Sequence, residues 1–405
     1  MNLGSSPKRV EREHAPAPLE SALLLACART WMLPEHHAHV EALVGTGLDW
    51  DRVVRLSGRH KVLPLLYRNL SAIRSGRFPA EAMTRLRGAF ELNCSRNLLL
   101  AGELLRVLTC LEAADVRTVA YRGPVLAKRA YGDVTLRQFN DLDLLVRNRD
   151  VDQARALVLS LGYKQKVPHG VAPSVHAKSM HHLVFAREAG RVLLELHWEI
   201  APRYFGYAID EGLWGRLTSV ELGGVPVPAL SGEDLLVVLC VHAALHGWQR
   251  LSWICDVAEV VRSQPQLDWP LAMRLGQQQG VSRVLLLGLY LAHDLLGAAI
   301  PEESWALVRG DAAVEPLAGQ AKRWLFPAEE VPRGPTPRYS LFGFHLGLQE
   351  TLGQKVAHGL RMAFVPSQED WALVRLPPRL SFLYGLVRPL RLVAKHGVRW
   401  IARPR

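Results

Sequence analysis

Asp141 and Asp143 are the residues of this chain whose types and spacing most clearly favour chemistry. They stand in Asn140–Val146 (NDLDLLV), which alternates polar and apolar residues as a β-strand does. Side chains two positions apart on a strand share one face, so the two carboxylates emerge side by side, about 6–7 Å apart. Like charges so placed repel, and Asp is disfavoured in strands. The pattern therefore favours a site that shares divalent cations; the structural alternative is a solvent-facing strand edge.

A third carboxylate, Glu195, lies in the apolar segment Arg191–Ile200 (RVLLELHWEI) and shares a strand face with His197. Burying this acid is unfavourable unless it binds a metal or a partner. If this strand lies beside the first one, Glu195 completes a triad of acids. His197 then contacts a ligand or orients Glu195, or it is a hydrogen-bonded packing residue. His181 and His182, on the preceding segment, are expected to be structural or to face a partner.

The turn Arg122-Gly123-Pro124 joins a short β-prone segment, Val116–Tyr121, to a helical one, Val125–Tyr131. Glycine permits close approach of the backbone to a ligand, and proline is tolerated at a first helical position. The helix N-terminus after the turn then favours an anion. Most strand-to-helix turns carry glycine for geometry alone, and that alternative stays open.

Helical spacing of apolar residues dominates on both sides of these segments. A helix is expected over Val151–Leu161, and a hairpin joins His181–Glu188 to Arg191–Ile200. Helices return at Ser231, which is followed by an acid three residues later. The expected fold class is α+β, with a small mixed sheet of about four or five strands between helical N- and C-terminal regions.

Composition and charge set the broad class. The 405 residues are 49% hydrophobic and 21% charged, as in an ordinary folded protein, and carry a net charge of +11 with a pI near 9.7. This charge attracts polyanions without choosing among them. The five cysteines are widely spaced and predict reduced, packed thiols, hence a cytoplasmic location. We expect neither a signal peptide nor a transmembrane segment.

Together these segments resemble the nucleotidyltransferase superfamily, with its DNA polymerase beta-like fold. More narrowly, the chain is similar to the uncharacterised bacterial nucleotidyltransferase family. The segments that carry the resemblance span about residues 50–262, and they are Asp49–Tyr67, Tyr121–Asp133, Leu136–Val146, Leu193–Trp198 and Trp253–Val261. The residue pattern along the chain predicts a disordered lead at 1–17, a helical region at 18–112, a helical domain at 201–310, and a Pro/Arg-rich segment with a basic tail at 311–405. The resemblance implies that the region between the helical ones, 113–200, is the nucleotidyltransferase catalytic core.

The resemblance also implies an activity, the transfer of a nucleoside monophosphate from an NTP such as ATP to a small-molecule or peptide acceptor. Mg²⁺ or Mn²⁺ would be held by the catalytic acids Asp141, Asp143 and Glu195. Nucleotide-binding residues would be Arg122, Gly123, Arg137 and His197, with Arg137 the preferred phosphate ligand and Lys128 a further candidate. Proline stands at 124 where the superfamily usually has serine, and glutamate at 195 where many members have aspartate.

Two other functions remain open. A chain that kept the fold without turnover would be a nucleotide-binding or scaffolding protein, a reading that the serine-less turn supports. Alternatively, the basic residues between Arg379 and Arg405 could dock the chain to RNA or to an anionic membrane. His242, His246 and Asp256 project from expected helices, but the two histidines could equally be a packed pair.

Overall fold

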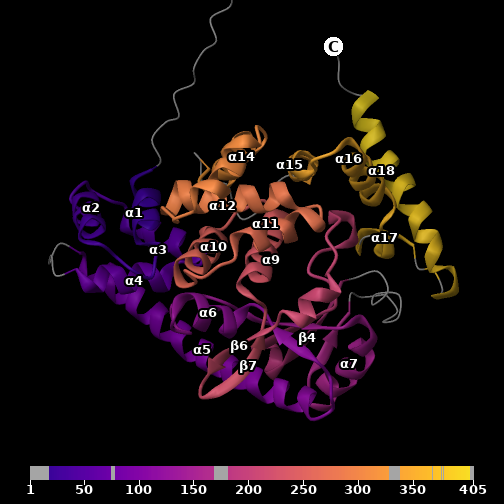
Figure 1. Cartoon of the computed structure of the whole chain (residues 1–405), viewed down its shortest axis with the longest axis horizontal. Coiled ribbons are helices and arrows are strands. Elements are labelled where there is room, and N and C mark those ends of the chain that lie inside the picture. The colour runs from indigo at the N-terminus through magenta and orange to yellow at the C-terminus, as the bar shows by residue number, and fades with distance from the viewer. Residues whose placement is uncertain are drawn as a thin grey trace, which may run out of the picture.

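The computed structural model describes residues 18–73, 78–167, 181–327, 338–366, 368–374, 376 and 378–401. The disordered lead expected at 1–17 lies outside these residues. A layer that contains the sheet lies on one side of the molecule, and most of the other helices lie above it in the view of Figure 1. The expected α+β fold, a small mixed sheet between helical regions, is confirmed.

The sheet has five strands in the order β1-β2-β5-β4-β3. Strands β2 and β5 are parallel, and the other three neighbouring pairs are antiparallel. Because β3 and β4 come between β2 and β5 in the chain, the acid-bearing strands meet only after a crossover. The strands are β1 (Thr118–Ala120), β2 (Asp141–Val146), β3 (Lys164–Lys166), β4 (His182–Arg187) and β5 (Val192–His197).

The two faces of the sheet have opposite character. Alternation on β2 and β5 puts Leu142, Leu144, Leu194 and Leu196 on one face, where they are fully buried in a core formed with α5 (Ala80–Glu112) and α7 (Val151–Ser160). Helix α5 has 33 residues and is therefore about 50 Å long, enough to run under the sheet and on to the N-terminal helices. The opposite face carries the acids.

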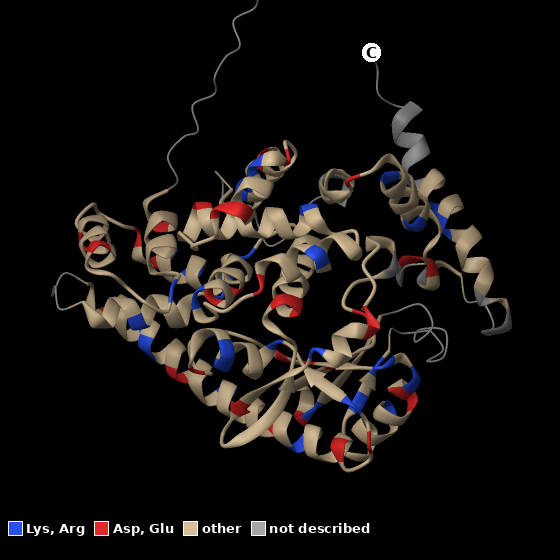
Figure 2. Cartoon of the chain, in the orientation of Figure 1, with Lys and Arg blue, Asp and Glu red and all other residues tan. Residues whose placement is uncertain are grey.

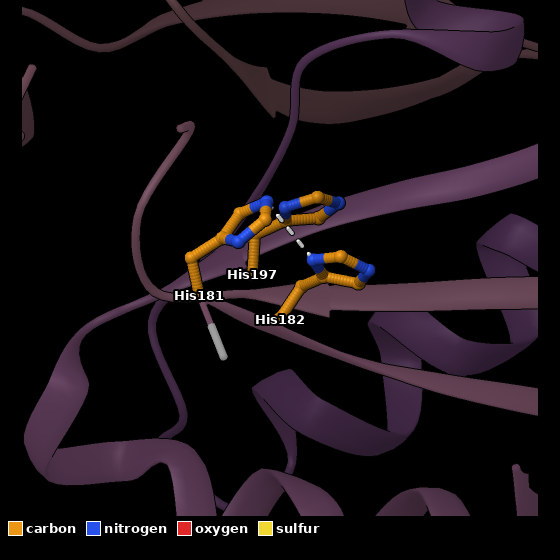
Figure 3. Close-up of side chains that lie close together, drawn as sticks. All are labelled: His181, His182 and His197. Atoms are coloured by element: carbon orange, nitrogen blue, oxygen red, sulfur yellow. Dashed lines mark hydrogen bonds between the residues drawn. The ribbon is translucent and has the colours of Figure 1, made fainter. Parts of the chain in front are cut away.

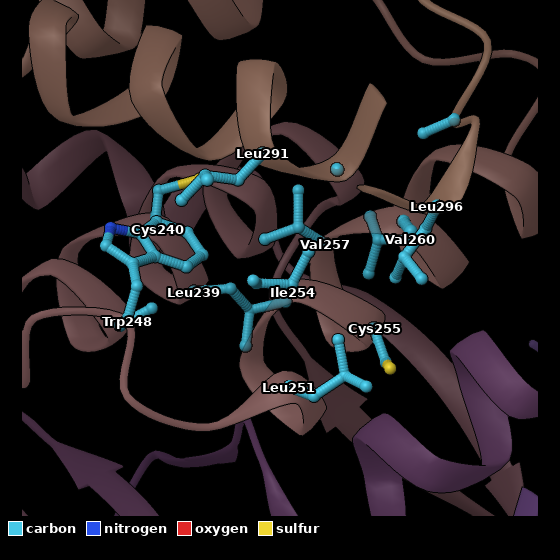
Figure 4. Packing of buried hydrophobic residues seen from close by; sticks show 14 of the residues in the cluster. Leu239, Cys240, Trp248, Leu251, Ile254, Cys255, Val257, Val260, Leu291 and Leu296 are labelled. Carbon is cyan, nitrogen blue, oxygen red and sulfur yellow. The ribbon is translucent and has the colours of Figure 1, made fainter. Parts of the chain in front are cut away.

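A second and larger hydrophobic core joins the N-terminal helices to those that follow the sheet. Its centre lies between α9, α10 and α12, where Cys240, Trp248, Ile254 and Leu291 are buried (Figure 4). Gly288 permits this packing, because a Cβ there would lie 2.3 Å from Cys240 Sγ. The helices of this core include α1 (Leu19–Cys27), α3 (Trp50–Arg59), α4 (Leu63–Ala72), α9 (Gly232–Leu245), α10 (Leu251–Ser263), α12 (Ser282–Leu296) and α14 (Val314–Leu325).

Several local predictions are confirmed. Ser231 is the N-cap of α9, and its hydroxyl accepts a hydrogen bond from the Asp234 backbone N–H at 3.1 Å. The strands β4 and β5 form the expected hairpin, which turns at Glu188–Gly190. Helix α6 (Gly123–Tyr131) follows the glycine turn and ends at Gly132, whose φ of 75° is left-handed.

One hairpin was not expected from the sequence. Strands β6 (Thr218–Leu222) and β7 (Val225–Ala229) pair across a Gly223-Gly224 turn, with both glycines at positive φ. Two prolines in β7 weaken the strand pattern, but they are tolerated because the hairpin forms a two-stranded sheet of its own.

The remaining helices are α2 (Pro34–Val44), α11 (Trp269–Gln278), α13 (Glu302–Gly310), α15 (Arg338–Leu348), α16 (Leu352–Phe364), α17 (Gln368–Leu373) and α18 (Tyr384–Ile401). Of these, α2, α11, α13 and α15 also add buried residues to the larger core. Basic and acidic residues are intermixed over both layers (Figure 2). Several basic residues lie on α16 and α18. Among the described helices, none has the length and apolarity needed to cross a membrane.

Candidate active site

The acids of β2 and β5 come together because the two strands are adjacent and parallel. Asp143 pairs in register with Glu195, and Asp141 pairs with Leu193. Asp143 is 2% exposed, whereas Asp141 and Glu195 are half-buried and open toward solvent. The structure therefore places all three predicted acids on one face.

His197 lies between two of these acids. Its Nε2 is 3.2 Å from Glu195 Oε2 and 3.4 Å from Asp143 Oδ1, and the side chain is buried. Burial by itself lowers the pKa of this imidazole, but the two carboxylates outweigh it and raise the pKa to about 9. His197 is thus a cation that neutralises part of the acidic face.

The three carboxyl groups differ in their affinity for protons. Burial raises the pKa of Asp143, but Arg122 and His197 outweigh it and hold the pKa well below the usual range. Glu195 follows the same pattern, with its pKa lowered mainly through His197. The pKa of Asp141 is raised, first by burial and then by the neighbouring Asp143 carboxylate. Asp143 and Glu195 are therefore the acids of this face that release their protons most readily.

Arg122 is a second cation that contacts this acidic face directly. Its guanidinium lies 3.4 Å from Asp143 Oδ1 and 3.4 Å from His242 Nδ1. The bond leaves capacity unused: among the described residues, neither Asp143 Oδ2 nor Arg122 Nε has a hydrogen-bond partner. Buried polar atoms without partners are rare, and here both belong to one ion pair.

The glycine turn brings backbone against the acidic strand. Gly123 has a φ of 59°, and a Cβ at this position would lie 3.2 Å from the Asp141 carbonyl oxygen. Both features favour glycine. Pro124 is buried in the first turn of α6, and Lys128 lies near the other end of that helix, where its Nζ donates to the Gly132 carbonyl.

Arg137, predicted as a phosphate ligand, is engaged elsewhere. Its Nε and Nη2 donate to the two carboxylate oxygens of Asp256 at 2.7 and 2.8 Å, and it is 5% exposed. The Tyr131 hydroxyl donates to the same carboxylate at 2.7 Å. Arg137 therefore holds α10 against the sheet layer, and its role toward phosphate stays a prediction.

Two cations near the acids were not singled out from the sequence. Lys61 lies in the turn between α3 and α4, with a left-handed φ of 54° that is uncommon for lysine. Its pKa is lowered to about 8, first by burial and then by Arg250, while Asp141 opposes this shift. Arg250 immediately precedes α10 and is exposed. No pattern marks either position; only Gly58 and Gly247, shortly before them, indicate turns.

The turn that carries Lys61 is attached to α10. The Ser252 backbone N–H donates to the His60 carbonyl at 3.1 Å, and the Leu251 N–H donates to His60 Nδ1 at 3.3 Å. The turn between α3 and α4 is thereby fixed beside Arg250. The helical region thus supplies cations to a site whose acids come from the sheet.

Aromatic rings border the same cations. His246 and Trp253 stack with their ring centroids 5.3 Å apart, and the Arg250 guanidinium lies 5.3 Å from the centre of the Trp253 ring. His242 packs against both rings, so the two histidines are a packed pair as well as neighbours of Arg122. Such flat rings at a half-open site can stack on a nucleobase.

Two groups of side chains have the spacing of metal ligands. One comprises Asp143, Glu195 and His197, and the other His181, His182 and His197. Within each group the candidate ligand atoms lie within 4.8 Å of one another. The unpartnered Asp143 Oδ2 fits a cation, because a buried carboxylate oxygen needs a donor or a positive charge.

The chain is similar to two solved structures and matches the model of one protein family. The solution structure of the antibiotic-resistance factor ANT(2'')-Ia matches at 17% identity and a TM-score of 0.28, over 53% of this chain and 97% of that one. The crystal structure of an antigenic nucleotidyltransferase-like protein from Paracoccidioides brasiliensis matches at 16% identity and a TM-score of 0.26, over 47% of this chain and 91% of that one. A search among curated proteins finds no match. Residues 46–297, more than half of the chain and all of the acidic site, match the family described as uncharacterised nucleotidyltransferase, and the protein belongs to that family.

Proposed function

We propose that this nucleotidyltransferase moves a nucleoside monophosphate from an NTP to a hydroxyl of a small-molecule or peptide acceptor, with a divalent cation held by Asp141, Asp143 and Glu195. The observation that carries the proposal is the unsatisfied ion pair of Asp143 and Arg122 on this acidic face. Buried charges with unused hydrogen-bonding capacity are typical of binding sites rather than of scaffolds.

The chemistry follows from the charges present. The acceptor oxygen bonds to the α-phosphorus while the bond to the bridging oxygen of the β-phosphate breaks, and pyrophosphate leaves with that electron pair. The hydroxyl proton passes to a base on the acidic face or to water. Mg²⁺ or Mn²⁺ bound to the carboxylates supplies Lewis-acid stabilisation of phosphate charge and lowers the pKa of the acceptor hydroxyl.

The cations of the chain would hold the rest of the nucleotide. Arg122 contacts Asp143, and Lys61 and Arg250 interact electrostatically with Asp141, so all three lie near the acids. Guanidinium groups bind phosphate oxygens through paired N–H bonds. The backbone of Gly123 approaches the same strand. The stacked His246 and Trp253 rings are suited to the base. Since NTPs are intracellular metabolites, we place the reaction in the cytoplasm.

The test is a thermal-shift titration of full-length protein with each of the four NTPs, with and without Mg²⁺. At a nucleotide concentration about 100 times Kd, binding stabilises the native state by about 2.7 kcal/mol. We expect this shift in the wild type for at least one NTP, only with metal, and not in Asp143→Asn. The control, Asp51→Asn, alters an exposed acid and should retain it. A shift that persists in Asp143→Asn would exclude the proposed site.

Turnover is tested separately, by release of pyrophosphate with candidate acceptors. Metal-dependent binding without pyrophosphate release from any acceptor would favour the non-catalytic alternative, a protein that binds nucleotide as a scaffold.

A further inference from the structure

Three histidines gather where β4 begins and β5 ends (Figure 3). His182 pairs in register with His197, and their rings stack with centroids 4.9 Å apart. His181 immediately precedes β4, and its ring centroid lies 4.3 Å from that of His182. The transfer proposed above assigns no role to His181 or His182.

Asp143, Glu195 and His197 have the spacing of metal ligands, and His182 lies beside them on the neighbouring strand. His197 Nε2 lies 3.2 Å from Glu195 Oε2 and 3.4 Å from Asp143 Oδ1, and His182 Nε2 lies 4.0 Å from the same Glu195 oxygen. Four ligands about 2.1 Å from a tetrahedral ion lie about 3.4 Å from one another. Release of the His197 proton and small side-chain movements would therefore place these atoms around one cation.

A second observation points to a cation at this position. Asp143 is 2% exposed, and its Oδ2 has no hydrogen-bond partner in the described parts of the chain. A buried carboxylate oxygen without a donor is unfavourable. A bound cation would remove that penalty.

We propose that Asp143, Glu195, His197 and His182 bind a first-row transition metal ion, beside an oxygen-ligated position that Asp141 helps to form. Imidazole nitrogen favours ions such as Zn²⁺, Co²⁺ and Ni²⁺, whereas Mg²⁺ prefers oxygen ligands and keeps several waters. The inference rests on the proposed function in one respect, since it names the ion at one of the metal positions of that site.

His181 acts in this proposal as a positioning residue. Its Nε2 lies 3.0 Å from His182 Nδ1, which leaves His182 Nε2 directed toward Glu195. Metal-bound histidines usually make such a contact through their second nitrogen, and loss of the contact weakens metal binding by about 10–100-fold.

The test is titration of full-length protein with Co²⁺. The buffer contains excess Mg²⁺ and no nucleotide. We expect stoichiometric binding and the visible absorption of Co²⁺ with nitrogen ligands. His182→Gln should weaken binding by at least about tenfold, and His181→Gln by about 10–100-fold with the absorption band altered. The matched control is His39→Gln, an exposed histidine on α2, which lies on the other side of the molecule from β4 (Figure 1).

Equal Co²⁺ affinity in His182→Gln and His39→Gln would overturn the proposal. X-ray absorption of the Zn²⁺-loaded protein gives a second measurement: imidazole scattering supports the assignment, and a shell of oxygen atoms alone contradicts it. Since His197 is buried, its variants can lose structure, so the half-buried His182 decides the outcome.

Asp141→Asn separates this inference from the proposed function. It should remove the Mg²⁺-dependent nucleotide shift while Co²⁺ binding remains. If the wild type binds Co²⁺ through histidine but shows no nucleotide shift, the proposed function fails and the metal assignment stands. If the nucleotide shift is present and Co²⁺ does not bind, the metal assignment fails and the proposed function stands.

Discussion

Two buried Arg–Asp pairs lie close together in this protein and differ in how fully they are satisfied. Arg137 and Asp256 form two parallel bonds of 2.7 and 2.8 Å, and Tyr131 adds a third to the carboxylate. Arg122 and Asp143 meet through one contact of 3.4 Å, with Asp143 Oδ2 and Arg122 Nε unpartnered among the described residues. The saturated pair fixes helix to sheet, whereas the open pair keeps bonding capacity for a ligand.

The comparison shows that residue type alone does not separate structure from function. Arg137 is closer in sequence to the acids than Arg122 is, and it is the more deeply buried of the two. Yet its Nε and Nη2 already donate to a carboxylate that matches their geometry. The predictions below use stability and nucleotide affinity as separate measurements of the two pairs.

The largest expected effect comes from breaking the saturated pair. Asp256→Ala leaves the Arg137 guanidinium buried without a counter-ion, so the free energy of unfolding should fall by about 3–5 kcal/mol. Urea denaturation measures this loss. The control is Asp51→Ala, which breaks an exposed pair with Arg85 and should change stability by less than about 1 kcal/mol. A loss of stability in Asp256→Ala as small as in the control would refute the structural role of the Arg137–Asp256 pair.

The open pair should respond in the opposite manner. Arg122→Gln removes a cation from the acidic face, and a lost charged hydrogen bond corresponds to about 1.5–3 kcal/mol, or about 10–100-fold in nucleotide affinity. Stability should fall by less than in Asp256→Ala, because the Arg122 contact is single and long. Calorimetric titration with Mg²⁺ and the preferred NTP measures the affinity. Unchanged nucleotide affinity together with a large loss of stability would mean that Arg122 stabilises the fold and does not bind nucleotide.

Lys61 provides a test that depends on pH. With a pKa of about 8, it is about nine-tenths charged at pH 7 and about one-tenth charged at pH 9. Nucleotide affinity should therefore fall by up to about tenfold between these pH values in the wild type. Lys61→Met should bind weakly at both, so a pH dependence that persists in this variant would contradict the role of Lys61.

The same substitution should stabilise the protein. The folded state lowers the pKa of Lys61 from its ordinary value of 10.5, so the charged lysine opposes folding below pH 8 and this effect disappears above pH 10.5. Lys61→Met should raise the free energy of unfolding at pH 7 by on the order of 1 kcal/mol, and by less at pH 10. Denaturation at both pH values measures the difference.

The smallest effect should come from Tyr131→Phe, which removes one bond from the saturated pair. Loss of the hydroxyl that donates to Asp256 should lower stability by about 1 kcal/mol and leave nucleotide affinity unchanged. Denaturation and the nucleotide titration are measured on the same preparation. Weaker nucleotide binding in this variant would mean that the saturated pair also serves the site.

The sequence by itself determined the local pattern of the fold. Alternation on Asn140–Val146 and Arg191–Ile200 predicted both acid-bearing strands. Successive side chains of a strand point to opposite faces of the sheet, so a strand with one face in the core alternates between apolar and polar residues. Helical spacing and the Ser231 cap predicted α9 for similarly local reasons. The β6–β7 hairpin was missed, since its prolines obscure the strand pattern.

Only the tertiary structure decided which charges meet. The crossover that makes β2 and β5 neighbours sets Glu195 opposite Asp143, and a turn more than 60 residues earlier brings Lys61 to the same place. The sequence could not show that Asp256 would occupy Arg137, because both partners lie on surfaces that become buried only when α10 packs against the sheet layer. Pairing of buried charges depends on distances of a few ångströms, which local sequence pattern does not encode.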